Sequence, residues 1–234
     1  MKTTVILGVM DEVFSLKESV DVLNRLNTDI EILLVYSPYS TEPARAMGLK
    51  LIATYENVTM QTQVTPGIGG AYQDGFNWAT TEFVLMMSSD LETDPNLVSR
   101  MIADLKAHPD IDIVAVSRWL QKSSFVGYSR ILLIANFIFQ SIIRIVFKTK
   151  MTDSTYAFRI YRRKSLENVV FREKRHGFFL ESLLLPLVQG NKVLEIPGVW
   201  KNRTEGVRQI SFSNYQTYIK VIFGAVKLKN TISK

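Results

Sequence analysis

Two carboxylates, Asp90 and Glu92, follow a short apolar run, Phe83 to Met87, near the middle of the chain. Five apolar residues in a row are too few for a helix and fit a buried strand of a parallel sheet. In such sheets the ligand crevice lies outside the carboxyl ends of the strands, and side chains two apart on an extended segment point the same way. We therefore predict that both carboxylates face a bound ligand. Oxygen ligands of this kind suit Mg²⁺ or Mn²⁺ bridging a diphosphate.

A structural role for the same stretch is an open alternative. Asp94 and Pro95 are typical of a helix start, so Asp90 and Asp94 could serve only to cap the next helix while Glu92 lies in solvent. The stretch taken alone favours neither interpretation.

The composition limits the possible metal sites and partners. The 234 residues contain no cysteine and only two histidines, His108 and His176, so disulfides and thiolate sites are excluded and a metal ion is expected on carboxylates. Lys and Arg number 28 against 22 Asp and Glu, and the chain is strongly basic from Arg118 onward. This excess favours an anionic partner, such as a phosphate or a lipid head group. Because no nucleic-acid recognition motif accompanies it, we expect no nucleic-acid partner.

Buried strands and amphipathic helices alternate through the first half of the chain. We expect strands at residues 4–9, 31–36, 49–54, 83–87 and 111–116, and helices at 15–26, 41–47, 71–79 and from Pro95 to about Ala107. Ser15 and Glu18 have the spacing of a capping box that begins the first helix. The Gly67–Gly70 cluster lacks the full spacing of a dinucleotide-binding loop and does not follow a clear strand, so we exclude a nicotinamide or flavin site. The alternation predicts an α/β protein with a mainly parallel sheet.

Two apolar stretches of the second half have helical spacing and carry basic residues. Polar residues interrupt Ile131–Phe147, which makes a membrane-spanning helix less favoured than one lying in the membrane interface, and a core helix is an equal alternative. Tyr215–Lys229 repeats the pattern. The start of the chain lacks the features of a signal peptide. We therefore expect a cytoplasmic protein that lies peripherally on the cytoplasmic face of a membrane.

The motifs of the chain occur in the order found in one enzyme family. They are Gly8-Val9-Met10-Asp11-Glu12, Gly67 to Gly75, Ser88-Ser89-Asp90-Leu91-Glu92, Ser117-Arg118, Asp153 to Arg159, Gly177 to Glu181, and Arg203 with Gly206. This order, over about residues 4–212, resembles the family 2 glycosyltransferases of GT-A fold, and among them the dolichol-phosphate and polyprenyl-phosphate mannosyl- or glucosyltransferases. The resemblance implies one GT-A domain over residues 1–234, with a nucleotide-sugar-binding half (1–118), an acceptor half (119–212) and a C-terminal amphipathic helix (213–234).

The resemblance also implies an activity and its residues. The expected reaction moves a hexose from a GDP- or UDP-sugar to a polyprenyl-phosphate type of lipid at a membrane surface, with Mg²⁺ or Mn²⁺ on Asp90 and Glu92. The residues implied at the site fall into three groups: Asp90 and Asp153 as catalytic, Asp11, Glu12, Gly69, Ser89 and Asp90 as donor-binding, and Arg118, Arg130 and Arg203 as acceptor- or phosphate-binding. Guanidinium groups suit the last role because they bind phosphate bidentately.

Two positions depart from the family pattern. Tyr36-Ser37 stands where the second strand of the family ends in a pair of aspartates, and Ser88 stands where the first metal-binding aspartate is usual. These departures leave open a changed nucleotide preference, a weaker metal requirement or an inactive relative. Two rival functions stand beside the expected one. One is a transferase of cell-envelope or capsular glycan synthesis with a sugar acceptor, which needs Asp153 or Glu181 as a base. The other is a catalytically silent, membrane-associated protein that keeps the fold.

Overall fold

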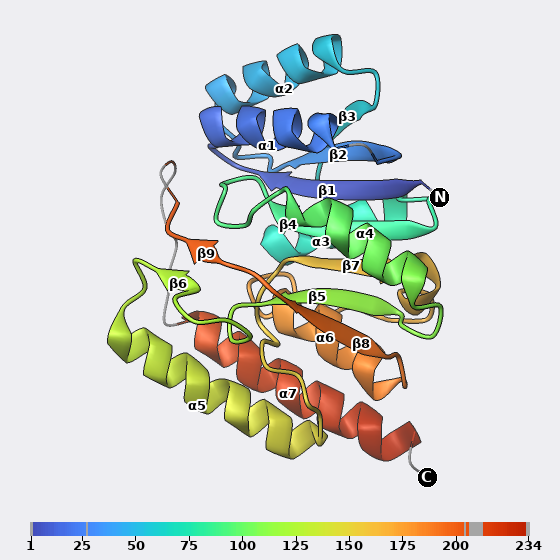
Figure 1. The fold of residues 1–234 in the computed structure, drawn as a ribbon, viewed down its shortest axis with the longest axis vertical. Helices are drawn as coiled ribbons and strands as arrows, with labels where there is room; N and C mark the ends of the chain where they lie inside the picture. Colours follow the sequence, from blue (N-terminus) through green and yellow to red (C-terminus); the bar gives the residue numbers. More distant parts are fainter. Residues whose placement is uncertain (1, 27, 204, 206–212, 233–234) are drawn as a thin grey trace.

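A single seven-stranded sheet forms the centre of the protein (Figure 1). The computed structural model describes residues 2–26, 28–203, 205 and 213–232, and Gly206 of the predicted loop lies outside them. The strands are β1 (Thr3–Val9), β2 (Ile30–Tyr36), β3 (Val58–Thr62), β4 (Phe83–Ser88), β5 (Ile113–Ser117), β7 (Arg159–Arg162) and β8 (Val193–Pro197), in the order β3-β2-β1-β4-β7-β5-β8. A separate pair consists of β6 (Phe125–Val126) and β9 (Trp200–Lys201).

Neighbouring strands run parallel except at β7, which is antiparallel to both β4 and β5. The expected α/β fold with a mainly parallel sheet is therefore confirmed. Sequence patterning does not predict β7 because its four residues include two arginines. Arg159 is nevertheless fully buried, since its guanidinium donates to the carbonyl oxygens of Ser154 (2.8 Å) and Phe179 (2.5 Å).

Helices cover both faces of the sheet because alternate residues of each strand point to opposite sides. Val5 and Leu7 of β1 pack in the core beneath three helices, α1 (Phe14–Arg25), α2 (Glu42–Thr54) and α4 (Leu97–Ala107). Ile6, between them, packs in the opposite core with α3 (Ile68–Trp78) and the start of α6 (Phe178–Val188). Strand β1 is thus buried on both faces and its carboxyl end is held rigidly between two layers.

The start of α1 differs from the expected capping box. The helix begins at Phe14, and its N-cap residue, Val13, makes no capping bond through its side chain. The Ser15 hydroxyl instead donates to Glu205, from the far end of the chain, while Glu18 pairs with Arg25. The local capping box is wrong because a distant carboxylate takes the place of the local one.

Helix α2 is longer than expected, and the strand predicted at residues 49–54 is wrong. Thr41 accepts the amide of Ala44 at its start, and the helix runs on to Thr54. Gly48 lies inside the helix next to the fully buried ring of Tyr36. A Cβ at this position would lie 2.9 Å from Tyr36 Cζ, so the glycine makes room for the ring.

This close approach predicts a net loss of stability for Gly48→Ala. Alanine favours helices over glycine by about 1 kcal/mol, but overpacking a buried site costs about 1–3 kcal/mol, so we expect net destabilisation. Gly224, inside α7 (Ser213–Ile232), has no atom within 4 Å of the added Cβ, so Gly224→Ala should be neutral or stabilising. Chemical denaturation of both variants measures the difference. Equal effects would contradict the steric explanation of Gly48.

A third layer, consisting of α5 (Arg130–Phe147) and α7, lies beyond α6 at the lower edge of the molecule (Figure 1). Only Gln140, Ile143 and Phe147 of α5 are buried, so the core-helix alternative is wrong. Among the residues that the structure describes, α5 is the one helix whose length and composition would allow it to cross a membrane. Its outer face is apolar and exposed, at Ile131, Ile134, Phe137, Ile138, Ile142, Ile145 and Val146.

Candidate active site

A cavity of about 410 Å³ opens at the carboxyl ends of β1 and β4, where the sequence predicts the ligand crevice. One end is acidic and is lined by Asp11, Glu12, Asp90 and Glu92. The rest of the lining is mostly apolar and aromatic and comes from α5, α7 and neighbouring loops, namely Tyr128, Leu132, Ala135, Asn136, Phe139, Tyr156 and Tyr218. Tyr156 adjoins the acidic end, because its hydroxyl donates to Glu92 O (3.2 Å). The cavity therefore joins two chemically different halves.

Asp90 and Glu92 lie together at the acidic end, on the segment that follows β4. Asp90 is buried, and its Oδ1 accepts bonds from the hydroxyl of Ser88 (2.5 Å) and the amide of Glu92 (3.0 Å). Its Oδ2 lies 2.8 Å from Nη2 of Arg203. Glu92 Oε1 accepts from Nε of the same arginine (3.1 Å), and its Oε2 accepts from Nε1 of Trp200 (3.0 Å). Neither carboxylate caps α4, which begins at Leu97.

The surroundings of these carboxylates disfavour their ionised form. Burial, and then the charge of Glu92, raises the pKa of Asp90, although Ser88 and Arg203 act in the opposite direction. Burial likewise raises the pKa of Glu12, whose Oε2 accepts the amides of Met10 (2.8 Å) and Asp11 (3.2 Å). The acidic end is therefore best stabilised with a positive group inside it.

The donor set at this end suits a divalent cation. The guanidinium of Arg203 binds both carboxylates at once, which shows that Asp90 and Glu92 direct oxygens at one cationic position. No group of three or more His, Asp or Glu side chains that could jointly hold a metal ion is found within the described part of the chain. Two carboxylates and a nearby hydroxyl still fit Mg²⁺ or Mn²⁺, because Mg²⁺ usually keeps several water ligands.

The predicted donor-binding residues separate into two groups. Asp11, Glu12 and Ser89 line the cavity, and the Ser89 hydroxyl donates to the carbonyl oxygen of Gly8 (2.7 Å). Gly69 does not line it. Its amide donates to Lys174 O (2.9 Å), and a Cβ here would lie 2.5 Å from Cβ of Phe178, so this glycine allows α3 and α6 to pack closely.

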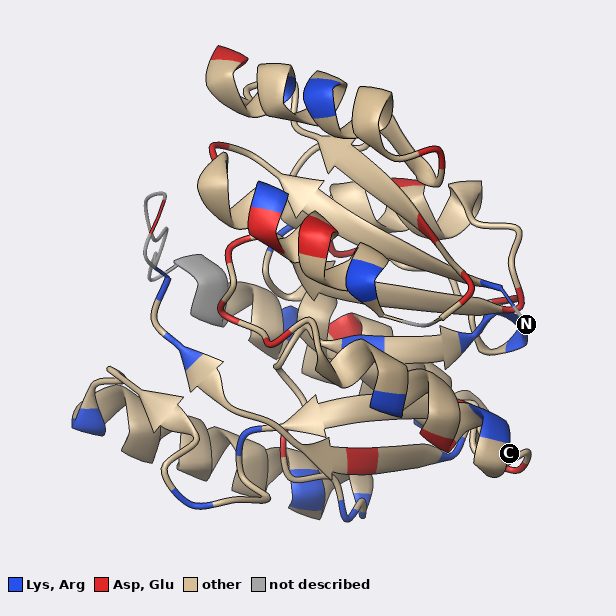
Figure 2. Cartoon of the chain, turned by 45° about the horizontal axis from the view of Figure 1, so that its top comes forward, with Lys and Arg blue, Asp and Glu red and all other residues tan. Residues whose placement is uncertain are grey.

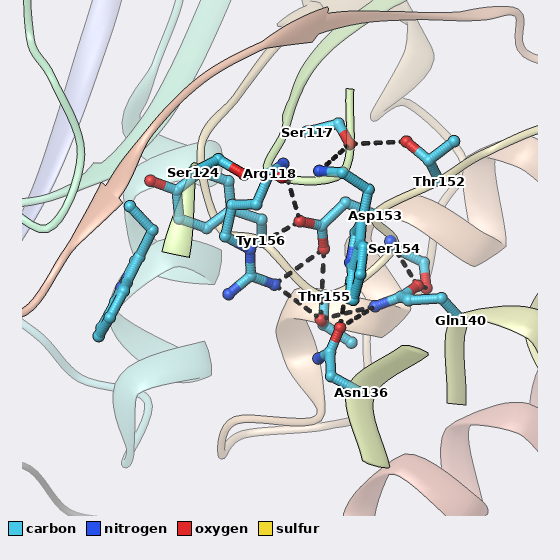
Figure 3. A network of polar contacts seen from close by, with 12 residues as sticks. Ser117, Arg118, Ser124, Asn136, Gln140, Thr152, Asp153, Ser154, Thr155 and Tyr156 are labelled. Carbon is cyan, nitrogen blue, oxygen red and sulfur yellow. Dashed lines mark hydrogen bonds and ion pairs between the residues drawn. The ribbon is translucent and has the colours of Figure 1, made fainter. Parts of the chain in front are cut away.

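Arg118 and Asp153 form a buried ion pair beside the apolar end (Figure 3). Arg118 donates through Nε to Asp153 Oδ2 (2.7 Å) and through Nη2 to Oδ1 (2.9 Å), and its guanidinium stacks 4.6 Å from the ring centroid of Tyr156. Arg118 lines the cavity, and its Nη1 has no hydrogen-bond partner among the described residues. This nitrogen remains available to an anionic ligand.

Asp153 itself is fully buried and does not line the cavity. Its backbone amide donates to Glu195 Oε1 (2.9 Å), and Glu195 also accepts the amide and hydroxyl of Thr152 (2.7 and 2.9 Å). Burial raises the pKa of Glu195. The geometry thus suits Asp153 to positioning Arg118 more than to contact with a substrate, and its predicted catalytic role stays a prediction.

The same polar network reaches α5 (Figure 3). Gln140 accepts the amide and hydroxyl of Ser154 (2.9 and 2.6 Å) and donates to Thr155 Oγ1 (3.0 Å). One turn earlier, Asn136 lines the cavity, and its Oδ1 accepts Nε1 of Trp119 (3.2 Å). Asn136 and Gln140 are site residues that the sequence motifs missed, although two amides four residues apart in an apolar helix were a visible signal.

The remaining predicted arginines lie in different places. Arg203 lines the cavity but binds the two acidic residues. Arg130, at the start of α5, is exposed, does not line the cavity and makes no hydrogen bond or ion pair to the described residues. His176, not predicted at the site, lines the cavity, and burial followed by the charge of Arg203 lowers its pKa.

Comparisons with known proteins agree with this architecture. The family model "Glycosyl transferase family 2" matches residues 4–170. An undecaprenyl-phosphate mannosyltransferase of Micrococcus luteus is 24% identical over 151 residues, which cover 62% of this chain and 61% of that relative's length.

Solved structures of glucosyl-3-phosphoglycerate synthase from Mycobacterium tuberculosis have the same fold. The complex with Mg²⁺ and UDP has a TM-score of 0.74 at 14% identity, covering 97% of this chain and 79% of that one. The complex with Mn²⁺, UDP-glucose and phosphoglyceric acid has a TM-score of 0.71 at 15% identity, covering 97% and 80%. The expected GT-A fold is therefore confirmed, and the family model, which matches most of the residues, shows that the chain belongs to glycosyltransferase family 2.

Proposed function

We propose that the protein transfers a hexose from a nucleotide-diphosphate sugar to a lipid phosphate at a membrane surface. The position of α5 carries this proposal. One side of the helix lines the cavity at Leu132, Ala135, Asn136 and Phe139, while the other side exposes a row of large apolar residues. An acceptor with a phosphate head and a long apolar chain matches both sides, because its head can lie in the cavity while its chain stays in the bilayer.

The acidic end suits the donor. Asp90 and Glu92 would hold Mg²⁺ or Mn²⁺, and Glu12 and Asp11 would meet the nucleoside side of the donor. The cation would neutralise charge on the diphosphate. The solved structures of similar fold contain Mg²⁺ or Mn²⁺ with UDP or UDP-glucose, which supports this part of the proposal. With no carboxylate at Tyr36 or Ser37, recognition of the base has to rest on other groups.

The opposite end suits an anionic acceptor. Nη1 of Arg118 lacks a described partner, and Oδ1 of Asn136 is bound by Trp119, which leaves the Asn136 amide nitrogen as a second donor group lining the cavity. A phosphate oxygen attacks the anomeric carbon while the bond from that carbon to the diphosphate breaks. A phosphate is already ionised near neutral pH, so this step needs no strong base.

The alternative with a sugar acceptor lacks its base. A hydroxyl nucleophile must lose a proton, and Asp153 and Glu181 were the candidates for this role. Asp153 is bound to Arg118, and Glu181 accepts the amides of Arg172 (3.0 Å) and Glu173 (2.9 Å) outside the cavity. The geometry therefore favours the lipid phosphate over the sugar.

The outer face of α5 and α7 suits an anionic bilayer. Lys229 of α7 donates to Val146 O of α5 (3.2 Å), so the helices lie side by side, and α7 adds exposed Ile219 and Phe223. Neither helix contains an acidic residue, and Figure 2 shows α5, below β6, with blue but no red. Apolar faces with basic residues bind membrane interfaces that contain anionic lipids. We propose peripheral attachment here, and the cytoplasmic location stays a prediction.

Membrane binding predicts a specific effect of Ile138→Glu. The residue is 54% exposed in the middle of α5, so a charge there should weaken binding to anionic liposomes about tenfold or more, the equivalent of losing most of one buried apolar side chain. Leu49→Glu changes an exposed apolar residue of α2, at the opposite end of the molecule, and is the matched control. Co-sedimentation measures both. Equal binding of both variants would contradict an α5 interface.

A ligand panel tests the function itself. Calorimetry with GDP- and UDP-hexoses, with and without Mn²⁺, should show metal-dependent binding of one class of donor. Vesicles with polyprenyl phosphate should then accept the sugar, whereas soluble 3-phosphoglycerate, the type of acceptor named in the solved structures, should not. Absence of heat with every donor would support the catalytically silent alternative. Transfer to 3-phosphoglycerate alone would refute the lipid acceptor.

A further inference from the structure

Glu205 caps a helix that is distant in sequence. Its Oε1 accepts the amides of Val13 (3.0 Å) and Phe14 (3.2 Å), and its Oε2 accepts the amide and hydroxyl of Ser15 (both 2.8 Å). The first amides of a helix have no partner within the helix, and a carboxylate there is also favoured by the helix dipole. Helix α1 gains its N-terminal cap from a segment some 190 residues away.

Two residues before Glu205, the same segment places Arg203 in the acidic end of the cavity. Arg203 binds Asp90 (2.8 Å) and Glu92 (3.1 Å), and its side chain is 23% exposed. Helix α1 directly follows Asp11 and Glu12, which line the same end. Arg203 and Glu205 are thus each held by contacts near the donor end, Arg203 by Asp90 and Glu92 and Glu205 by the start of α1.

We propose that Glu205 is a positioning residue that holds Arg203 between Asp90 and Glu92 as an internal cation, which a divalent metal ion must displace. The inference rests on the cation site of the proposed function and adds to it a competitor and the residue that holds the competitor in place. Displacement would free the guanidinium of Arg203 for the anionic groups of a substrate, the role that the sequence predicts for it.

Thermodynamic linkage makes this competition measurable. If Arg203 occupies the cation position in most molecules, the apparent metal affinity equals the intrinsic affinity multiplied by the small fraction of molecules in which the position is open. Weakening the Glu205 cap raises that fraction and tightens metal binding. Linkage is reciprocal, so bound metal must also weaken the cap.

The decisive variant is Glu205→Gln because two explanations predict opposite signs. If Glu205 affects the site only through its charge, removing a negative charge weakens binding of a cation. If it holds Arg203 in place, Glu205→Gln tightens Mn²⁺ binding about three- to tenfold. Mn²⁺ affinity in the absence of nucleotide, measured by the electron paramagnetic resonance of free Mn²⁺, gives the sign. Glu18→Gln, also on α1 but partly exposed and paired with Arg25, is the charge-matched control and should change nothing.

Two further variants keep the test independent of folding. Arg203→Gln removes the competitor and should tighten Mn²⁺ binding about tenfold, and adding Glu205→Gln to it should give no further gain. Should Glu205→Gln fail to fold, Ser15→Ala takes its place. This variant removes one hydrogen bond to Glu205 and should increase the Mn²⁺ affinity by a smaller factor.

Hydrogen exchange supplies a second readout. Saturating Mn²⁺ should speed exchange of the amides of Phe14 and Ser15. If Glu205→Gln binds Mn²⁺ no more tightly than the wild type while Arg203→Gln still binds Mn²⁺, the inference is overturned and the proposed function stays intact. Failure of every variant to bind Mn²⁺ would overturn the cation site and the inference together.

Discussion

Asp90→Asn is expected to lower the rate of sugar transfer about a hundred- to a thousandfold, the range seen when one charge-stabilising group is removed from an active site. The amide keeps an oxygen for the bonds from Ser88 and the amide of Glu92, so the segment after β4 should stay folded. The asparagine lacks the negative charge that faces the guanidinium of Arg203, which occupies the position suited to a cation. Transfer assays over a range of Mn²⁺ concentrations measure the loss, and higher Mn²⁺ should not restore the rate.

Asp94→Asn is the matched control for Asp90→Asn. Asp94 lies four residues further on, is exposed and accepts the amide of Asn96 (3.0 Å). Its variant should retain full activity. Turnover of Asp90→Asn at the wild-type rate would refute the assignment of Asp90 to the donor.

Asp153→Asn is expected to destabilise the fold by about 3–5 kcal/mol, because it leaves the buried guanidinium of Arg118 without its counter-ion. Asp153 is fully buried and Arg118 is 7% exposed, so water cannot take over the role of the carboxylate. For a chain of this size the loss corresponds to a melting temperature lower by roughly 10 °C. Differential scanning calorimetry measures it.

An exposed ion pair provides the control for Asp153→Asn. Asp110 and Lys192 pair at 3.3 Å with side chains more than 60% exposed, so Asp110→Asn should leave the stability nearly unchanged. The double variant Arg118→Met/Asp153→Leu removes both buried charges and should regain much of the stability while remaining inactive. Recovery of activity in that double variant would show that Arg118 has no role in the reaction.

Local sequence patterns predicted the central strands and the acidic end of the cavity. Continuous apolar runs such as Phe83 to Met87 have few alternatives to a buried strand, and the polar residues that follow such a strand must lie at its carboxyl end. Asp90 and Glu92 therefore lie where they were expected. The extent of α5 was also predictable, because the apolar stretch from Ile131 to Phe147 is long and few polar residues interrupt it.

The errors in the fold come from partners that are distant in sequence. Gly48 packs inside α2 against the ring of Tyr36, and the cap of α1 depends on Glu205. Neither partner can be identified from residue type or spacing nearby. In both places a tertiary contact replaced the local signal on which the prediction was based.

The arginines show the same limit for the site. Residue type predicts that an arginine can bind a phosphate, but the partner it meets in the fold decides whether it is free to do so. Arg118 is fixed by Asp153, Arg203 binds Asp90 and Glu92, and Arg130 is exposed away from the cavity. Only the fold separates these three environments.

The double role of α5, as cavity wall and as exposed apolar surface, has a consequence for kinetics. Under the proposed function, a lipid acceptor that enters along this helix would be met by lateral diffusion within a two-dimensional layer. The relevant concentration would then be its mole fraction among the surrounding lipids, so diluting vesicles with inert lipid should slow turnover even when the amount of acceptor per millilitre stays the same.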